Sequence, residues 1–323
     1  MNSTASLADA IGRHDRRALA QAITLVESGL KEHQSQAREL LAALPAPGQP
    51  ALRIGITGPP GAGKSTFIET LGRHLIDHGH SVAVLTVDPS SVVSGGSILG
   101  DKTRMPTLSA NEKAFVRPSP SSGTEGGVGR FTREAIAVCE AAGFDRVIVE
   151  PVGVGQSELR AASMTDVFVL LLVPGSGDEL QGIKRGVMEL ADLILVNKAD
   201  GQLEQTANRT VSEYAAATGF LRARTADWKV PVLAMSALKD IGVVDVLEQM
   251  EKFFVHIIKA GLLSSRRESQ ASEALMQALH EGLLDRFLRN AKNADEVERV
   301  RREVAIGRLT PGLAARSLID QFT

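Results

Sequence analysis

The sequence predicts an α/β fold in which helices cover both faces of a mostly parallel sheet, with helical extensions at both ends of the chain. From Leu52 onward, short apolar runs alternate with longer amphipathic stretches, the pattern of parallel strands joined by helices. Before residue 44 and after residue 262, apolar residues recur at helical spacing instead. The expected strands are Arg53–Thr57, Val82–Val87, Ala114–Arg117, Arg146–Val149, Val167–Val173, Leu193–Val196 and Val230–Ala234.

The two ends of the chain differ in pattern from its middle. Residues 1 to about 44 are expected to be helical, and the proline-rich stretch 45–50 then acts as a linker. Residues 262–323 are expected to be all helical, with an apolar stripe of Leu275, Leu279, Leu283, Phe287 and Leu288. The expected domains are an N-terminal helical extension with its linker (1–50), a central α/β domain (51–260) and a C-terminal helical arm (261–323).

Composition indicates an ordinary globular protein rather than a binder of nucleic acid or membrane. The 323 residues have a formal net charge of −2, with 43% hydrophobic and 23% charged residues, so no overall basic field attracts a polyanion. The single cysteine, Cys139, lies in an apolar helical pattern and is expected to be a small buried hydrophobe. The sequence contains no secretory signal pattern and no apolar run of membrane-spanning length, so a cytoplasmic location is expected.

The most specific local signal is Gly58–Ser65, which fills every fixed position of the pattern G-x-x-x-x-G-K-[ST]. An apolar strand precedes it and an amphipathic helix follows, which is the setting of a phosphate-binding loop. Glycines let backbone N–H groups turn toward phosphate oxygens, and the helix N-terminus adds partial positive charge. Lys64 is expected to reach the β- and γ-phosphates and the Ser65 hydroxyl to bind Mg²⁺. The predicted phosphate-loop residues are Gly58, Pro59, Pro60, Gly61, Ala62, Gly63, Lys64, Ser65 and Thr66.

Two later loops fit the recognition of guanine. Asn197-Lys198-Ala199-Asp200 follows an expected strand, and the Asp200 carboxylate can accept hydrogen bonds from guanine N1–H and the exocyclic amine, which adenine lacks at that edge. Asn197 can tie this loop to the phosphate loop, and the Lys198 stem can cover the base. Ser236-Ala237-Leu238 follows the next apolar run and is expected to offer a backbone N–H to guanine O6. The order of the three motifs predicts GTP or GDP as the ligand.

Two strand ends supply carboxylates for magnesium. Asp88 ends one strand and Asp101 follows in a long loop, which we interpret as a first switch ordered by Mg²⁺ and the γ-phosphate. A helix cap or turn cap is the alternative role for Asp88. Glu150 ends another strand and is expected to face Mg²⁺ or its waters, while Gly153 donates its N–H to the γ-phosphate. Gln156 either orients water or is a surface amide. The predicted catalytic residues are Lys64, Glu150, Gly153 and Gln156, and the metal ligands are Ser65, Asp88, Asp101 and Glu150.

A third glycine-rich loop, Pro174–Lys184, follows the expected strand at 167–173. Its polar side chains either solvate the loop, with Asp178 as a helix cap, or form a third switch that couples the nucleotide state to a partner. The residues assigned to this coupling are Asp178, Glu179, Gln181 and Lys184.

Several of these segments together resemble the MeaB/ArgK family, which includes the methylmalonic aciduria type A proteins. The resemblance extends over nearly the whole chain and implies a P-loop NTPase G domain of the SIMIBI type, with Mg²⁺-dependent hydrolysis of GTP to GDP and phosphate. It also implies that Asp88, Asp101 and Glu150 serve the magnesium site across switches I and II, and that the third loop is switch III. The segments that carry it are Val87–Ser91, Gly95–Met105, Arg117–Ser121, Val152–Glu158 and Gly177–Lys184.

The same resemblance implies a biological role. Members of the family chaperone adenosylcobalamin-dependent acyl-CoA mutases, typically methylmalonyl-CoA mutase: they gate cofactor loading, protect the mutase and aid release of damaged cofactor. They are homodimers built through the C-terminal helices. The chain departs from the family pattern at Pro151, Val92, Val93 and Glu125. These departures leave room for a different client, such as an isobutyryl-CoA or 2-hydroxyisobutyryl-CoA mutase.

Two other classes of protein share parts of this pattern. A transport-associated kinase or ATPase would favour adenine, against which Asp200 argues. A nickel metallochaperone GTPase would carry a cluster of cysteine and histidine. His74 and His78 have the i, i+4 spacing of a metal pair, but nothing nearby completes a site, and we expect them to be exposed histidines at a helix end. For the C-terminal helices, packing on their own G domain is the alternative to a homodimer.

Overall fold

The structure, a computed structural model, describes residues 4–88, 104–120, 125–151, 157–175, 185–221, 223–288 and 291–320. The chain divides into two compact units, Met1–Glu268 and Ser269–Thr323. The second unit holds the end of α13 (Leu262–Leu288) together with α14 (Ala291–Ala305) and α15 (Pro311–Asp320). None of the helices in the described ranges has the length and hydrophobicity needed to span a bilayer. The sequence-based boundaries at residues 50 and 260 stay predictions.

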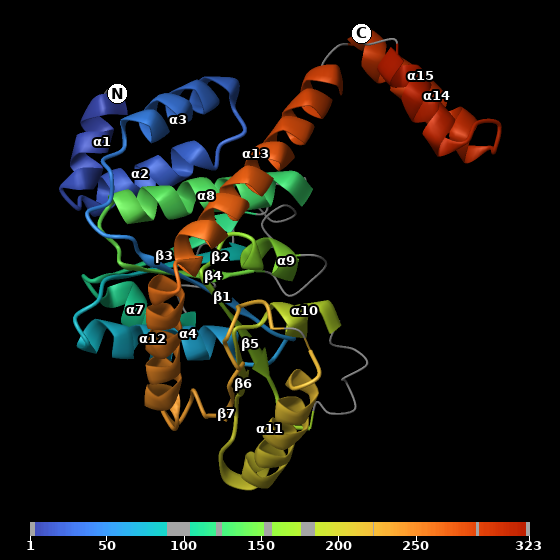
Figure 1. The fold of residues 1–323 in the computed structure, drawn as a ribbon. Helices are drawn as coiled ribbons and strands as arrows, with labels where there is room; N and C mark the ends of the chain where they lie inside the picture. The colour runs from blue at the N-terminus through green and yellow to red at the C-terminus, as the bar shows by residue number, and fades with distance from the viewer. Residues whose placement is uncertain are drawn as a thin grey trace. The chain divides into compact units, whose positions relative to one another are not determined.

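The first unit is built around a seven-stranded sheet with the order β3-β2-β4-β1-β5-β6-β7, in which every neighbouring pair is parallel (Figure 1). The strands are β1 (Leu52–Thr57), β2 (Val82–Asp88), β3 (Ala114–Pro120), β4 (Arg146–Glu150), β5 (Val167–Leu172), β6 (Leu193–Val196) and β7 (Val232–Ala234). All seven strands expected from the sequence are confirmed. The largest differences are that β7 begins at Val232 rather than Val230 and that β3 runs to Pro120 rather than Arg117.

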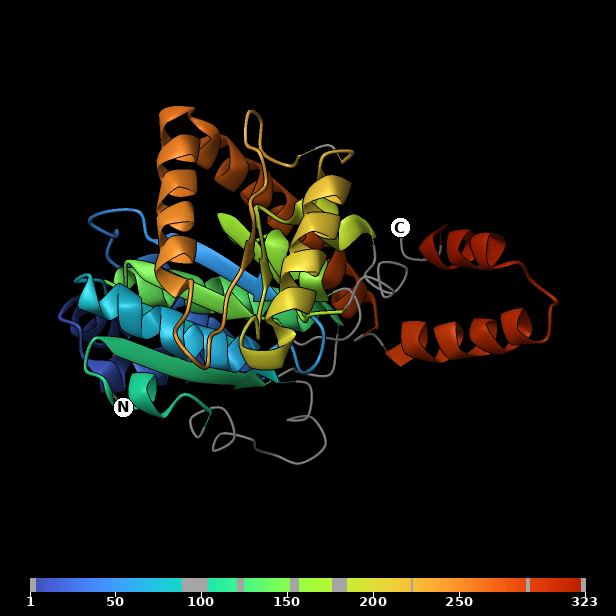
Figure 2. The same cartoon turned by 90° about the horizontal axis from the view of Figure 1, so that it is seen from below.

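The alternation of side chains along a strand explains why helices cover both faces of this sheet. Val82 and Val84 of β2 pack in one apolar cluster with α4, α7 and α12, whereas Ala83 and Leu85 pack in another with α8. A third cluster buries α9, α10 and α11 against β5 and β6. Figure 2 shows the face that carries α4 and α12. The helices are α1 (Thr4–Gly12), α2 (Arg16–Val26), α3 (Lys31–Ala43), α4 (Lys64–Asp77), α7 (Pro106–Ala110), α8 (Glu125–Ala141), α9 (Ser157–Ala162), α10 (Arg185–Leu190), α11 (Glu204–Thr218) and α12 (Val243–Lys259).

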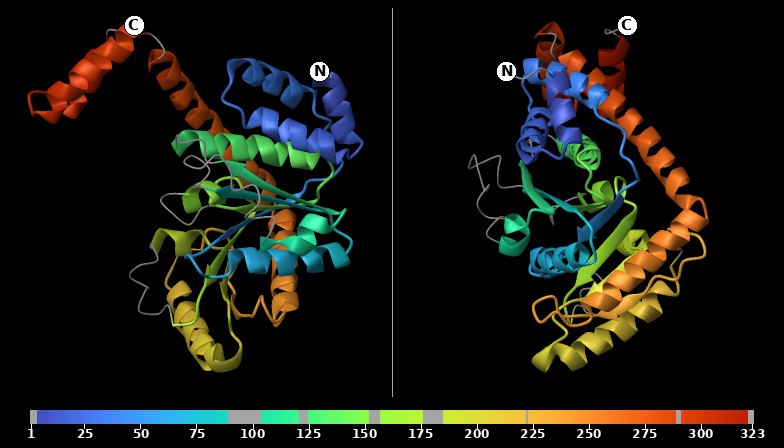
Figure 3. Two further views of the ribbon diagram at one scale, coloured as in Figure 1. Left: turned by 180° about the vertical axis from the view of Figure 1, so that it is seen from behind. Right: turned by 90° about the vertical axis from the view of Figure 1, so that its left-hand side faces the viewer.

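The N-terminal segment forms three helices, α1 to α3, which pack outside α8 (Figures 1 and 3). Helical periodicity alone did not predict the breaks between them. The first break arises because His14 adopts a left-handed φ of 64° and Asp15 caps α2, accepting the N–H groups of Arg17 at 2.8 Å and Ala18 at 3.1 Å. These two donors hold the pKa of Asp15 below its ordinary value.

Glu27, at the C-terminal end of α2, joins this outer layer of helices to the sheet. Its side chain is 5% exposed, and the carboxylate accepts hydrogen bonds from Arg117 Nη2 and Ser119 Oγ, each at 2.5 Å. Both donors lie in β3, within the segment Arg117–Ser121 that contributes to the family resemblance. The N-terminal helices are therefore bonded to the edge strand of the sheet by a buried carboxylate as well as by apolar packing.

Cys139 lies in α8 and is fully buried, as the apolar pattern around it predicted. Burial raises the pKa of its thiol well above the ordinary value, because the thiolate loses its hydration. The side chain therefore acts as a small hydrophobe in the cluster that packs α8 against the sheet.

Two buried aspartates at the amino ends of β5 and β6 anchor the start of α13. Asp166, whose side chain is 0% exposed, accepts two hydrogen bonds from Arg267, at 2.9 Å from Nε and 2.6 Å from Nη2. Asp192 accepts the Thr225 hydroxyl at 2.7 Å and faces Arg266 Nη1 at 3.4 Å. The first two turns of α13 are thus fixed to the sheet by charge pairs that little water reaches.

Replacing Arg267 by alanine is expected to lower the free energy of unfolding by about 3–5 kcal/mol, because the Asp166 carboxylate then stays buried without its charged partner. Urea denaturation measures the change. Arg209→Ala is the matched control, since Arg209 also pairs with a carboxylate, Glu213, but with its side chain 82% exposed. The control is expected to lose about 0.5 kcal/mol or less. Equal losses in the two variants would contradict the anchoring role of Arg267.

Candidate nucleotide-binding site

The phosphate loop, residues 58–63, joins the carboxyl end of β1 to the start of α4. Gly61 and Gly63 have φ values of 79° and 86°, in the left-handed region that residues with a Cβ atom rarely adopt. The helix begins at Lys64, and Phe67 is the residue whose N–H donates to Gly63 O. The N–H groups of the first turn before Phe67 have no helical acceptor. The loop therefore presents several backbone donors at a helix N-terminus, which suits a phosphate group.

Lys64 folds across the loop that precedes it. Its Nζ donates to Gly58 O at 2.9 Å and to Pro59 O at 3.3 Å. Burial lowers the pKa of Lys64 below its ordinary value, and the carboxylates of Glu150 and Glu158 oppose that change. The ammonium is thus held at the phosphate loop by two carbonyl groups.

Ser65 and Glu150, two of the four predicted magnesium ligands, lie next to each other. Ser65 Oγ donates to Glu150 Oε1 at 3.5 Å, so the end of β4 meets the first turn of α4. A hydroxyl and a carboxylate are hard oxygen donors of the kind that Mg²⁺ prefers, and the pair fits that ion. Pro151 is buried directly after β4 and has no N–H with which to extend the ladder, which accounts for the end of the strand at Glu150.

Several predicted residues lie outside the described part of the chain. Asp88 ends β2 as expected, and its backbone position pairs with Pro120, but its side chain is not described. The same holds for the side chain of Glu125 at the start of α8. The predicted residues that lie wholly outside the described ranges are Val92, Val93, Asp101, Gly153, Gln156, Asp178, Glu179, Gln181 and Lys184.

Asn197, the first residue after β6, connects the phosphate loop to the loop at residues 236–241. Its Nδ2 donates to Ala62 O at 2.7 Å, and its Oδ1 accepts the Ala237 N–H at 3.0 Å. The side chain is 2% exposed. A Cβ atom on Gly63 would come within 2.5 Å of Asn197 Nδ2, so the glycine leaves the space that this side chain occupies.

Lys198 and Asp200 lie on the solvent side of Asn197. Lys198 is exposed and has a left-handed φ of 62°. Asp200 is half-buried, and its carboxylate has no hydrogen-bond or ion-pair partner among the described residues. A half-buried carboxylate with open acceptor positions can receive two N–H donors from a ligand.

The loop at residues 236–241 is closed on itself. Ser236 and Ile241 exchange two backbone hydrogen bonds, at 2.9 and 3.0 Å, and Lys239 N–H donates to Ser236 Oγ at 3.2 Å. The Ala237 N–H, one candidate donor to guanine O6, is used by Asn197. Among the described residues the Leu238 N–H has no acceptor, and its side chain is 77% exposed. Leu238 therefore offers the open N–H donor of this motif.

The contacts between this loop and α4 were not predictable from the sequence pattern. Thr70 Oγ1 donates to Ala237 O at 2.9 Å, and Asp240 receives Arg73 and His74 of the same helix. The only sequence signal here was the histidine pair, and its expected exposed position is only partly right. His74 Nε2 lies 2.6 Å from Asp240 Oδ1 with 18% of its side chain exposed, while His78 bonds a helical carbonyl. Within the described ranges, no group of three or more metal-binding side chains forms around this pair or elsewhere.

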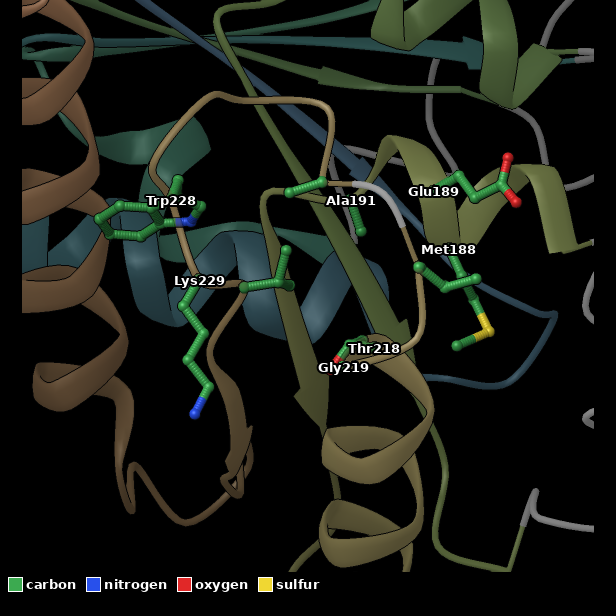
Figure 4. Close-up of a pocket in the computed structure, with 10 residues that line it drawn as sticks. Met188, Glu189, Ala191, Thr218, Gly219, Trp228 and Lys229 are labelled. Carbon is green, nitrogen blue, oxygen red and sulfur yellow. The ribbon is translucent and has the colours of Figure 1, made fainter.

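A pocket of about 330 Å³ lies away from these loops, between the ends of α10 and α11 (Figure 4). Its lining includes Met188, Ala191, Gly219 and Trp228, none of which belongs to a predicted nucleotide motif. The indole N–H of Trp228 donates to Asp192 O at 2.9 Å, so the ring forms a fixed wall. The pocket therefore does not contribute to the phosphate and base chemistry described above.

The chain is similar to one described family and to several of its named members. The family model described as "Methylmalonyl Co-A mutase-associated GTPase MeaB" matches residues 19–292. A protein of Mycobacterium tuberculosis named "Probable GTPase" is 48% identical over 314 residues, which cover 97% of this chain and 94% of that protein. The mouse protein named "Methylmalonic aciduria type A homolog, mitochondrial" is 44% identical over 317 residues, covering 95% and 76% of the two chains.

Two further relatives match over almost their whole length. The Escherichia coli protein named "GTPase ArgK" is 43% identical over 326 residues, covering 100% of this chain and 97% of that protein. A solved structure described as "Crystal structure of LAO/AO transport system kinase" superposes with a TM-score of 0.80 at 36% identity, covering 100% of this chain and 99% of that one. The fold derived above is therefore shared with a solved structure along the full chain.

Replacing Gly63 by alanine is expected to destabilise the nucleotide-free protein by about 1–3 kcal/mol more than Gly61→Ala does. Both substitutions force a residue with a Cβ atom into a left-handed conformation, but only the first displaces Asn197. Nothing lies within 4 Å of a Cβ atom on Gly61, so that variant measures the backbone strain alone. Thermal unfolding without nucleotide compares the two. Identical stability would show that Asn197 does not depend on the space at Gly63.

Proposed function

The chain belongs to the family of methylmalonyl-CoA mutase-associated GTPases, and from that premise we propose that it is a GTP-driven chaperone of an adenosylcobalamin-dependent acyl-CoA mutase. GTP hydrolysis itself follows from membership of the family. The observation that best supports the proposed site is the buried Asn197 amide, which joins the phosphate loop to the loop at 236–241. The nucleotide is assigned to the space that these loops border.

Guanine recognition is assigned to Asp200 and Leu238. The open carboxylate of Asp200 accepts the N1–H and exocyclic amine of guanine, and adenine would leave this half-buried carboxylate unpaired. The open N–H of Leu238 donates to guanine O6. The exposed Lys198 covers the base with its aliphatic stem.

The phosphates are assigned to the loop at 58–63 and to Lys64. The Lys64 ammonium, already held at the loop by two carbonyl groups, exchanges part of that contact for phosphate oxygens. Ser65 and Glu150 would hold Mg²⁺ together with Asp88 and Asp101, and the ion would supply positive charge at the γ-phosphate during hydrolysis. Gly153 is assigned to the γ-phosphate and Gln156 to the attacking water from the E-x-x-G pattern that follows β4 in the sequence.

The partner assignments rest on the family and on one feature of the arm. We assign Asp178, Glu179, Gln181 and Lys184 to contact with the mutase, because these residues form the predicted third switch. The described part of α13 leaves Leu275, Leu279 and Leu283 exposed by 61%, 47% and 57% at a spacing of four residues. A row of exposed leucines on one helix face supports a homodimer contact through the arm.

Replacing Asp200 by asparagine is expected to weaken GTP binding roughly 10- to 100-fold and to strengthen binding of xanthosine triphosphate, whose oxygen at position 2 accepts from the new amide. Calorimetric titration of both nucleotides measures the exchange of specificity. Glu204→Gln is the control, because Glu204 is an exposed carboxylate in the first turn of α11. Unchanged GTP affinity in Asp200→Asn would remove the assigned role of this residue. A kinase or transport ATPase would instead bind ATP at least as tightly as GTP in the unmodified chain.

The client is expected to accelerate GTP turnover, because a chaperone GTPase couples hydrolysis to the state of its partner. The turnover rate is to be measured alone and with purified methylmalonyl-CoA, isobutyryl-CoA and 2-hydroxyisobutyryl-CoA mutases. One of the three should raise the rate, and an unrelated enzyme of similar size should leave it unchanged. Turnover indifferent to all three mutases would count against the chaperone role but not against GTP binding.

A further inference from the structure

We propose that Thr70, Arg73 and His74 of α4 form a clamp that holds the loop at 236–241 in place and thereby sets recognition of position 6 of the guanine base. The inference rests on the proposed function, since it assigns the Leu238 N–H to guanine O6. It adds three residues of α4 and Asp240, which neither the nucleotide motifs nor the family resemblance identified.

The three clamp residues share one face of a helix. Their numbers follow the i, i+3, i+4 pattern, which places side chains side by side along one face. Thr70 Oγ1 donates to Ala237 O at 2.9 Å in a buried contact. His74 Nε2 lies 2.6 Å from Asp240 Oδ1, and Arg73 Nη2 bonds the other oxygen, Oδ2. Both carboxylate oxygens of Asp240 are therefore held by α4.

The loop can be positioned as one body because its own hydrogen bonds close it. The Ser236–Ile241 bridge and the Lys239–Ser236 bond fix its ends and its turn. Asp240 adopts a left-handed φ of 57°, a conformation that aspartate tolerates better than most residues. Holding Asp240 in place therefore also fixes the position of the Leu238 N–H, two residues earlier. Figure 2 shows the chain that leads into the orange α12 beside the cyan α4.

The first turn of α4, the helix that carries the clamp, is also part of the phosphate site. Lys64 and Ser65 form the first turn of α4, and His74 lies about 15 Å further along the same helix axis at 1.5 Å per residue. An α-helix is stiff over this length, so the clamp fixes the donor for position 6 relative to the phosphate-binding turn. Asn197 fixes the same loop from its other side through the Ala237 N–H. The contacts from α4 and from Asn197 therefore both fix the loop whose Leu238 N–H is assigned to position 6 of the base.

The test compares GDP with two analogues, each of which differs from GDP at one position of the base. Inosine diphosphate lacks the amine read by Asp200, and 6-thioguanosine diphosphate replaces the oxygen acceptor read by Leu238 with sulfur, a larger and weaker acceptor. Asp240→Ala is expected to weaken GDP binding about three- to fivefold. It should also reduce the preference for GDP over 6-thioguanosine diphosphate and leave the preference for GDP over inosine diphosphate unchanged. Calorimetric titration gives all three affinities.

Two further variants keep the result interpretable. Arg73→Ala removes one contact of the clamp, from a side chain that is 48% exposed, so the fold is expected to persist. The preference for GDP over 6-thioguanosine diphosphate should fall by a smaller factor than in Asp240→Ala. Asp245→Ala, an exposed aspartate in the first turn of α12, should change none of the ratios. The clamp is overturned if both base preferences fall together or if GDP affinity is unchanged in Asp240→Ala. Absence of any preference over inosine diphosphate in the unmodified chain would instead contradict the role of Asp200.

Discussion

The candidate site depends on one buried amide, that of Asn197, which contacts two loops far from it in the sequence. Its nitrogen bonds the phosphate loop at Ala62 and its oxygen bonds Ala237. Losing either partner would leave a buried polar group unpaired, at a cost of about 1–3 kcal/mol. The separation between the phosphate loop and the loop at 236–241 is therefore set before a nucleotide arrives. Such preorganisation lowers the ordering cost of binding.

The strand order brings the residues of the candidate site together at the carboxyl ends of the strands. Because β1 pairs with β4 and β5, and β5 pairs with β6, the segments that follow these parallel strands meet at their carboxyl ends. Ser65, in the first turn of α4, and Glu150, at the end of β4, are brought together in this way. The sheet thus assembles groups that lie more than 80 residues apart in the sequence, and α4 extends the same frame to Thr70 and Asp240.

The parts of this structure that the sequence predicted are those with a local physical signal. Seven apolar runs predicted seven strands, because strands buried on both faces consist mostly of apolar residues. The phosphate loop was predictable since its glycines and Lys64 occur at fixed spacing. The break at His14 was missed because a cap such as Asp15 starts a new helix without interrupting the apolar pattern.

Contacts between distant polar residues had no such signal. Asp240 bonds residues of α4 that lie 166 and 167 positions earlier, and a single aspartate in a loop gives no sign of its partner. The contact between Glu27 and Ser119 spans 92 positions and joins an outer helix to an edge strand. These pairs form only after the sheet order has brought their elements together, so spacing along the chain does not encode them.

The contacts at the amino ends of β5 and β6 explain where the first compact unit ends. The strands stop before residue 260, which suggested a boundary there, yet Arg266 and Arg267 belong with the sheet because they neutralise Asp192 and Asp166. A deletion that began at Leu262 would leave both buried carboxylates without these arginines, and the loss of stability would be mistaken for loss of a subunit contact. A truncation after Glu268 keeps both anchors and removes the second compact unit, which comprises the part of α13 that carries the exposed leucines together with α14 and α15. The arm can then be tested for self-association without disturbing the nucleotide site.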